Sequence, residues 1–337
     1  MALAVSGPVH SASAAIRPLD RAISARASRA SAARAFPRDS RHQASLDALA
    51  VASAAKPSRA PCAGRSASAR HDSQKHCAWR LRTRASTGDN ATSSSPSSSQ
   101  DVPQEANDRA LAQDKARSLV DDLKGTSIFL VGMMGSGKTT VGTLLADLLG
   151  YCFFDSDRVV EAAAGGASVA QIFAENGEEE FRQLESRVLA ELSSMGRLVV
   201  ATGGGAVTRP VNWSYLAHGV TVHLDVPVDQ LAHRVVAVGT GVRPLLSQAA
   251  EVEEQQAAAE SDEHSKTLSR LARLAADRKS QYSNADATIS LQDVAFRTAA
   301  EVADVTPTRV ALEILERLEQ MVAERKERDA ALRAKAG

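Results

Sequence analysis

The sequence predicts an α/β protein whose central, mainly parallel sheet is covered by helices on both faces. Short apolar runs recur between residues 127 and 290, and stretches with apolar residues at helical spacing separate these runs. The first run leads through a glycine-rich loop directly into a helical stretch. Strands that alternate with helices form parallel sheets, because each helix returns the chain to the starting edge of the next strand.

The expected elements alternate regularly along the chain. Strands are predicted at residues 127–131, 151–154, 198–201, 220–225 and 287–290. Helices are predicted at residues 139–149, 158–164, 168–176, 178–194, 228–238, 268–282 and 307–325. We therefore expect one core domain over residues 110–325, followed by a charged tail, residues 326–337, that frays.

The N-terminal 85 residues differ in composition from the rest of the chain. Residues 1–85 contain 15 Lys and Arg, four Asp and no Glu, and much of the remainder is Ala and Ser. Acid-poor segments rich in Arg and Ser are typical of organelle transit peptides. A disordered basic arm that binds nucleic acid is the alternative, but the Arg residues are spread out rather than clustered. The segment 86–109, which is rich in Ser at its start, is predicted to form a disordered linker.

Residues 86–337 are acidic, with 25 basic against 36 acidic side chains. This balance argues against general nucleic-acid binding. No run of about 18 consecutive apolar residues occurs, so no membrane span is expected. Only Cys152 of the three cysteines lies in this part, and the eight histidines show no metal-ligand spacing. A disulfide scaffold and a zinc site are therefore not expected.

Residues 132–139, GMMGSGKT, match the phosphate-binding pattern G-x4-G-K-[ST]. A strand precedes them and a helix follows, so that backbone amides of the loop point at phosphate oxygens beside the positive end of the helix. Lys138 is expected to bridge the β and γ phosphates of a nucleoside triphosphate, and the Thr139 hydroxyl to bind Mg²⁺. The context favours phosphoryl transfer over a chance glycine turn. The predicted nucleotide-binding residues are Gly135, Ser136, Gly137, Lys138, Thr139 and Thr140.

Asp155 and Asp157 follow the second apolar run and place two carboxylates at the carboxyl end of a strand, where open α/β sheets bind ligands. One could hold the Mg²⁺ shell, while the other accepts a hydrogen bond from, and deprotonates, the hydroxyl that is phosphorylated. An N-cap of the helix expected at residues 158–164 explains an Asp here equally well.

A glycine run at a further strand end and three arginines elsewhere in the chain are candidates for binding a ligand. Residues 202–205, Thr-Gly-Gly-Gly, permit close approach of a polar ligand, although a flexible turn without a ligand is the alternative. Arg182 lies three residues before Glu185 on a predicted helix, Arg243 lies in a glycine-containing segment typical of a mobile lid, and Arg278 lies in a late helix. Each arginine alone also fits a solvated surface charge.

Taken in order, the motifs G-M-M-G-S-G-K-T, D-S-D, F-R-x-x-E, T-G-G-G-A, V-R-P-L-L and R-x-x-x-Y resemble those of shikimate kinases, particularly the plastid enzymes of plants and algae. The likeness covers residues 127–318. It implies a P-loop fold of the nucleoside-monophosphate-kinase type with a mobile lid, and a location in the chloroplast stroma. It further implies that MgATP phosphorylates the 3-hydroxyl of shikimate, on the route to chorismate and aromatic amino acids.

The resemblance also implies a role for individual residues on the ATP side. Lys138 and Thr139 keep the roles stated above, and Asp155 would hold Mg²⁺ through water. Arg243 would move with the lid to reach the ATP phosphates and assist catalysis. Lid closure would exclude water, so that the phosphoryl group passes to shikimate and not to hydrolysis.

On the substrate side, the resemblance implies that Asp157 binds the reactive hydroxyl and that Glu185 steadies Arg182. The guanidinium groups of Arg182 and Arg278 would clamp the substrate carboxylate, a task suited to a planar, permanently charged group. The ring of shikimate would lie against Gly203, Gly204 and Gly205.

Two parts of the chain depart from the compact family pattern or have no clear counterpart in it. The acidic segment 247–266 is long for a lid and is predicted to be solvated. Phe296 and Arg297 are only candidates for contacts with adenine. A related nucleotide-binding protein without catalysis and a kinase of another small metabolite, such as gluconate, are the competing functional hypotheses, but Asp157, the glycine run and both carboxylate-binding arginines are present.

Overall fold

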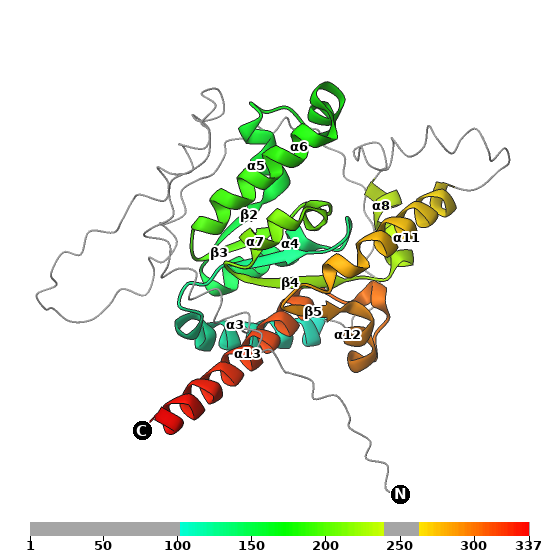
Figure 1. Ribbon diagram of the computed structural model, residues 1–337. Coiled ribbons are helices and arrows are strands. Elements are labelled where there is room, and N and C mark those ends of the chain that lie inside the picture. The colour runs from blue at the N-terminus through cyan, green and yellow to red at the C-terminus, as the bar shows by residue number, and fades with distance from the viewer. Residues whose placement is uncertain (1–101, 239–262, 337) are drawn as a thin grey trace, which may run out of the picture.

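The computed structural model describes residues 102–238 and 263–336, and this part of the chain is built on a five-stranded sheet (Figure 1). The strands are β1 (Ile128–Val131), β2 (Cys152–Asp155), β3 (Leu198–Ala201), β4 (Val220–Asp225) and β5 (Ala287–Ser290). Their order in the sheet is β2-β3-β1-β4-β5, and every neighbouring pair is parallel. The predicted parallel sheet is confirmed, with strand ends shifted by one residue at most.

Helices follow the strands along the chain as predicted. They are α4 (Lys138–Leu149), α5 (Ser156–Ala163), α6 (Val169–Ser194), α7 (Pro210–Leu216), α8 (Val228–Val238), α11 (Glu263–Tyr282), α12 (Leu291–Thr298) and α13 (Pro307–Ala336), with 3-10 turns η2 (Ala206–Thr208) and η4 (Val302–Asp304). The helices expected at 168–176 and 178–194 form α6, which breaks at Gly177, where φ is 84° and ψ is 170°. Helices α7 and α12 were not predicted, since seven or eight residues are too few for a helical period to stand out.

The core lies on both faces of the central strand β1, all four residues of which are buried. Close packing of α4 against the sheet depends on Gly142, because a Cβ at this position would lie 2.6 Å from Cε2 of Phe153 on β2. Strand β5, at the sheet edge, instead alternates buried and more exposed residues. The continuous apolar runs of the central strands therefore reflect burial on two faces, as expected for a parallel sheet.

The prediction of a disordered linker over residues 86–109 is wrong at its C-terminal end, because helix α3 (Val102–Leu123) begins well before residue 110. This helix lies along α13 (Figure 1), and its residues Ala112, Ala116, Leu119 and Leu123 are buried. Ion pairs flank this apolar contact: Lys115–Glu319 (2.7 Å), Asp122–Lys326 (2.8 Å) and Asp108–Arg309 (3.5 Å). The polar composition concealed the helix, because much of its buried face consists of small alanines and only two leucines.

The final helix is longer than the predicted 307–325. Helix α13 continues to Ala336 and extends beyond the rest of the domain (Figure 1). Ala, Leu, Lys, Arg and Glu dominate these last turns and are strong helix formers. The pairs Lys326–Asp122 and Arg325–Asp329 (3.8 Å) add contacts along this part. Within the described ranges, no helix is long and apolar enough to cross a membrane.

Candidate active site

The candidate site lies where β2, β3 and β1 end side by side. These strands are parallel neighbours, so their carboxyl ends meet at one edge of the sheet. The phosphate-binding loop follows β1, Asp155 ends β2, and the glycine run follows β3. Segments more than 60 residues apart in the sequence are thereby brought together.

The phosphate-binding loop has the backbone conformation that its glycines permit. Gly132, Gly135 and Gly137 have φ values of 150°, 79° and 87°. A Cβ at Gly132 would also lie 2.7 Å from the carbonyl oxygen of Leu224, at the end of β4. Nζ of Lys138 donates hydrogen bonds to the carbonyl oxygens of Gly132 and Met133, both at 2.8 Å. The ammonium group is thus held over its own loop, beside the N-terminus of α4.

Asp155 links the end of β2 to the loop and to the next helix. Its Oδ2 accepts a hydrogen bond of 2.8 Å from Oγ1 of Thr139, at the start of α4. Its Oδ1 accepts one of 3.1 Å from the backbone N–H of Asp157, so Asp155 is the N-cap of α5. The prediction of an N-cap is therefore confirmed for Asp155. The same carboxylate has a second contact, with Thr139 of the phosphate-binding loop.

Asp157 is a carboxylate whose ionisation is strongly perturbed by its surroundings. Its pKa is raised from 3.8 to about 7, first by burial and then by repulsion from Asp155 and Glu185; Lys138 and Arg182 oppose this rise. Its Oδ1 is buried and has no hydrogen-bond partner among the described residues. A carboxyl group with a pKa near neutrality and an unused oxygen is suited to accept a proton.

The glycine run lies directly against these carboxylates. A Cβ at Gly203 would lie 2.5 Å from Oδ1 of Asp157 and 2.8 Å from Oε1 of Glu185, a second buried oxygen without a partner among the described residues. The backbone N–H of Gly203 donates a 2.9 Å hydrogen bond to Oγ of Ser156, which holds the run beside α5. Glycine is required here because any side chain would overlap with the carboxylates.

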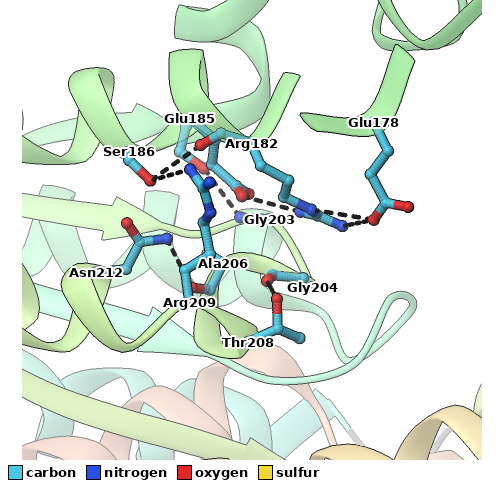
Figure 2. Close-up of polar contacts among 12 residues, drawn as sticks. Glu178, Arg182, Glu185, Ser186, Gly203, Gly204, Ala206, Thr208, Arg209 and Asn212 are labelled. Carbon is cyan, nitrogen blue, oxygen red and sulfur yellow. Dashed lines mark hydrogen bonds and ion pairs between the residues drawn. The ribbon is translucent and has the colours of Figure 1, made fainter. Parts of the chain in front are cut away.

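Arg182 and Glu185 form a buried ion pair on α6, shown in Figure 2. Nη1 of Arg182 donates a 2.9 Å hydrogen bond to Oε2 of Glu185, whose side chain is fully buried. Burial raises the pKa of Glu185, and the arginine opposes that rise. The guanidinium lies over Gly205, where a Cβ would be 2.5 Å from Nη1. Arg182 is therefore a core-facing cation, and the interpretation as a solvated surface charge is wrong for it.

The carbonyl oxygen of Gly204 joins α11 to the glycine run. It accepts hydrogen bonds from Nη1 of Arg278 (2.8 Å) and from the hydroxyl of Tyr282 (3.3 Å). The Tyr282 ring stacks on His223 of β4, with centroids 4.4 Å apart and planes 6° apart. A Cβ at Gly204 would lie 3.4 Å from the backbone nitrogen of Met134 in the phosphate loop. Gly204 thus lies between the phosphate loop and Arg278, which is itself buried.

The structure brings together most of the residues that the sequence analysis singled out. The residues that gather at the carboxyl ends of β1, β2 and β3 are Lys138, Thr139, Asp155, Asp157, Arg182, Glu185, Gly203, Gly204, Gly205 and Arg278. Gly135, Ser136, Gly137 and Thr140 lie in the loop and the first turn of α4. Arg243 and the expected lid lie outside the described residues.

No contact described here links Phe296 or Arg297, the candidates for binding adenine, to the phosphate-binding loop. Arg297, on α12, instead pairs with Glu313 of α13, and Phe296 is 88% exposed. Two residues of the site were not predicted: Glu178, which pairs with Arg182, and Tyr282, which was noted only as the last residue of the R-x-x-x-Y motif and contacts Arg278 and the carbonyl oxygen of Gly204. Their spacing of four residues from Arg182 and Arg278 was the available signal.

The order of the five parallel strands, the phosphate loop after β1 and the carboxylates after β2 define a P-loop phosphotransferase with the nucleoside-monophosphate-kinase fold. The family model described as shikimate kinase matches residues 134–318, which is more than half of the chain. The chain belongs to the shikimate kinase family.

Curated relatives include chloroplast proteins. Shikimate kinase 2, chloroplastic, of rice is 50% identical over 215 residues, which cover 64% of this chain and 67% of that protein. The shikimate kinase of Synechococcus elongatus is 43% identical over 198 residues, covering 59% of this chain and 90% of that protein. A solved shikimate kinase of Acinetobacter baumannii, in complex with shikimate, is 32% identical, with a TM-score of 0.47 over 63% of this chain and 98% of that one. The plant relatives and the acid-poor N-terminal region identify a chloroplast member of the family.

Proposed function

We propose that the site at the carboxyl ends of β1, β2 and β3 transfers the γ-phosphoryl group of MgATP to the 3-hydroxyl of shikimate. The product is shikimate 3-phosphate, an intermediate on the route to chorismate and aromatic amino acids. The observation that carries this assignment is the convergence of one basic carboxylate, Asp157, and two buried arginines beside the phosphate loop. A small acid with a hydroxyl group needs both kinds of partner: a proton acceptor at one end and cations at the other.

The phosphate loop is the ATP half of the proposed site. Its backbone amides lie at the N-terminus of α4, where a phosphate is favoured. Lys138, held by loop carbonyls in the structure, would exchange these contacts for the β and γ phosphates. Arg243, outside the described residues, is proposed to reach the phosphates from the lid.

The acceptor half is formed by Asp157, the two arginines and the glycine run. Arg182 and Arg278 would hold the substrate carboxylate, and the ring would lie over residues 203–205, where glycines permit close approach to the backbone. Asp157 would take the proton of the 3-hydroxyl onto its unused Oδ1 as the oxygen attacks phosphorus. Orientation of both reactants accounts for much of the rate in such transfers.

Thr139 and Asp155 would hold Mg²⁺. Their side-chain oxygens are 2.8 Å apart and belong to the oxygen-only donor set that this ion prefers. Residues 102–238 and 263–336 contain no cluster of three or more His, Cys, Asp or Glu that could hold a metal. This fits an ion that keeps waters and substrate phosphates as its other ligands. When bound, Mg²⁺ neutralises charge on the transferring phosphates.

The proposed reaction is tested by assaying the protein without residues 1–85 for ADP formation with MgATP and shikimate. Shikimate 3-phosphate, identified by mass spectrometry, is the expected product. Gluconate and other small polyols serve as the comparison substrates, and they are expected to give no phosphorylated product. Absence of product from a folded protein, or preference for gluconate, contradicts the proposal.

Replacing Arg182 with Ala is expected to raise the KM for shikimate by about 10- to 100-fold, because charge-assisted hydrogen bonds each contribute roughly 1.5–3 kcal/mol. The KM for ATP should change little. The change also leaves Glu185 buried without its cation, so thermal unfolding must be measured alongside, and Arg182→Lys, which keeps a charge, is the companion variant. Arg187→Ala, an exposed arginine of α6, is the matched control. An unchanged KM for shikimate would remove Arg182 from the site.

The rate is expected to depend on the ionisation of Asp157. Its raised pKa means that the basic, deprotonated form accumulates only as pH rises through about 7. The value of kcat/KM should therefore fall as pH decreases below neutrality, approaching about tenfold per pH unit for a single required carboxylate. Initial rates between about pH 5 and pH 9 measure this profile. A flat profile down to about pH 5 would show that Asp157 is already ionised there in the working enzyme.

A further inference from the structure

A second glutamate, Glu178, contacts the same guanidinium as Glu185. Oε1 of Glu178 accepts hydrogen bonds from Nε (3.4 Å) and Nη2 (3.3 Å) of Arg182 (Figure 2). The two glutamates differ in environment, since the side chain of Glu178 is 56% exposed and that of Glu185 is fully buried. One carboxylate thus approaches the guanidinium from the protein interior and the other from the solvent side.

The two glutamates leave part of the guanidinium unused. Arginine has five N–H groups, and Glu178 takes those on the edge formed by Nε and Nη2. Glu185 takes one N–H of Nη1. Each terminal nitrogen keeps one further N–H, and both nitrogens lie against Gly205, where no side chain intervenes. Two N–H groups on one edge of a guanidinium match the two oxygens of a carboxylate.

We propose that Glu178 is a positioning residue for substrate binding. With Glu185, it fixes the rotation of the Arg182 guanidinium so that the terminal edge beside Gly205 is presented to the carboxylate of the substrate. One contact at Nη1 leaves the plane free to rotate about that point. A second contact at the opposite edge removes this freedom before the substrate arrives, which lowers the entropic cost of binding. The inference rests on the proposed role of Arg182.

The backbone of α6 explains how Glu178 reaches the arginine. The break at Gly177 starts a new helical segment at Glu178, so its carboxylate lies in a first turn, where the helix dipole favours negative charge. Residues 178, 182 and 185 share one helix face through their spacing of four and three. Neighbouring Glu179 points to a different partner and pairs with Arg209. Consecutive glutamates in this segment therefore have separate contacts, and Glu178 is the one directed at Arg182.

The test is the steady-state kinetics of Glu178→Gln, which removes the charge and keeps the size. The KM for shikimate is expected to rise by about 3- to 10-fold, the loss expected for one hydrogen-bonded contact of ordinary strength. The value of kcat and the KM for ATP should stay within about twofold, because the reacting atoms are untouched. Glu178→Asp, which keeps the charge on a shorter side chain, should fall between the wild type and Glu178→Gln. Glu180→Gln, an exposed position of the same helix with the same charge loss, is the control expected to match the wild type.

Three outcomes overturn the proposal. A lower KM for shikimate in Glu178→Gln would mean that Glu178 competes with the substrate for Arg182. An unchanged KM, or equal changes in Glu178→Gln and Glu180→Gln, would mean that it has no specific role. Arg182→Ala is measured in parallel. An unchanged KM for shikimate in Arg182→Ala refutes the role of Arg182 in substrate binding. A raised KM in Arg182→Ala together with an unchanged KM in Glu178→Gln refutes only the positioning role of Glu178.

Discussion

Replacing Asp157 with Asn is expected to lower kcat by about 10²- to 10⁴-fold, the usual contribution of a positioned general base. Asparagine has nearly the same shape but cannot take the proton of the attacking hydroxyl. The unpartnered Oδ1 of Asp157 lies beside Gly203, and its pKa of about 7 suits proton transfer near neutral pH. The loss should therefore appear in the chemical step, with little change in ATP binding.

Stopped-flow or steady-state rates with saturating shikimate and MgATP measure this change, and calorimetry with ATP alone checks the nucleotide half of the site. Asp147→Asn is the matched control, since Asp147 is exposed on α4 and is expected to keep the rate of the wild type. Removing the repulsion among Asp155, Asp157 and Glu185 should also leave the folded state at least as stable as before. If Asp157→Asn keeps most of its kcat, the assignment of the base is wrong.

The second large effect is expected from removing helix α3. A chain that starts at residue 125 loses the buried side chains of Ala112, Ala116, Leu119 and Leu123 and uncovers the face of α13 that they contact. Burial of the two leucines alone contributes roughly 1.5–3 kcal/mol each. Because the net stability of a domain is only about 5–15 kcal/mol, this loss should lower the melting temperature by many degrees and favour aggregation.

A chain that starts at residue 100 is the control, because it keeps the whole of α3 and its ion pairs with α13. It should melt at the same temperature as a chain that starts at residue 86. We accordingly propose that the transit peptide is removed before Val102, so that the imported protein retains α3. Equal melting temperatures for the chains starting at residues 100 and 125 would contradict a structural role of the helix.

The helix α3 also shows where inference from composition fails. The segment 102–109 is as polar as a linker, and the helical spacing of Ala112, Ala116, Leu119 and Leu123 is easily overlooked because two of these four buried residues are small alanines. Its stability comes from contacts with α13, about 200 residues away, including Lys115–Glu319 and Asp122–Lys326. Contacts over such a separation have no local signature in the sequence. The helical end of α13 was missed for a related reason, since charge there was taken as a sign of fraying.

The sequence by itself determined the phosphate loop and the alternation of strands and helices. Both depend on local patterns: glycines that adopt positive φ at Gly135 and Gly137, and apolar runs in strands buried on two faces. Only the tertiary structure decided what the remaining polar residues do. Arg182 and Arg278 are almost 100 residues apart, and each alone could have been a surface charge; the sheet brings both against the glycine run. The pKa of Asp157 and the contact of Glu178 with Arg182 likewise arise from burial and proximity, which exist only after the strand ends have met.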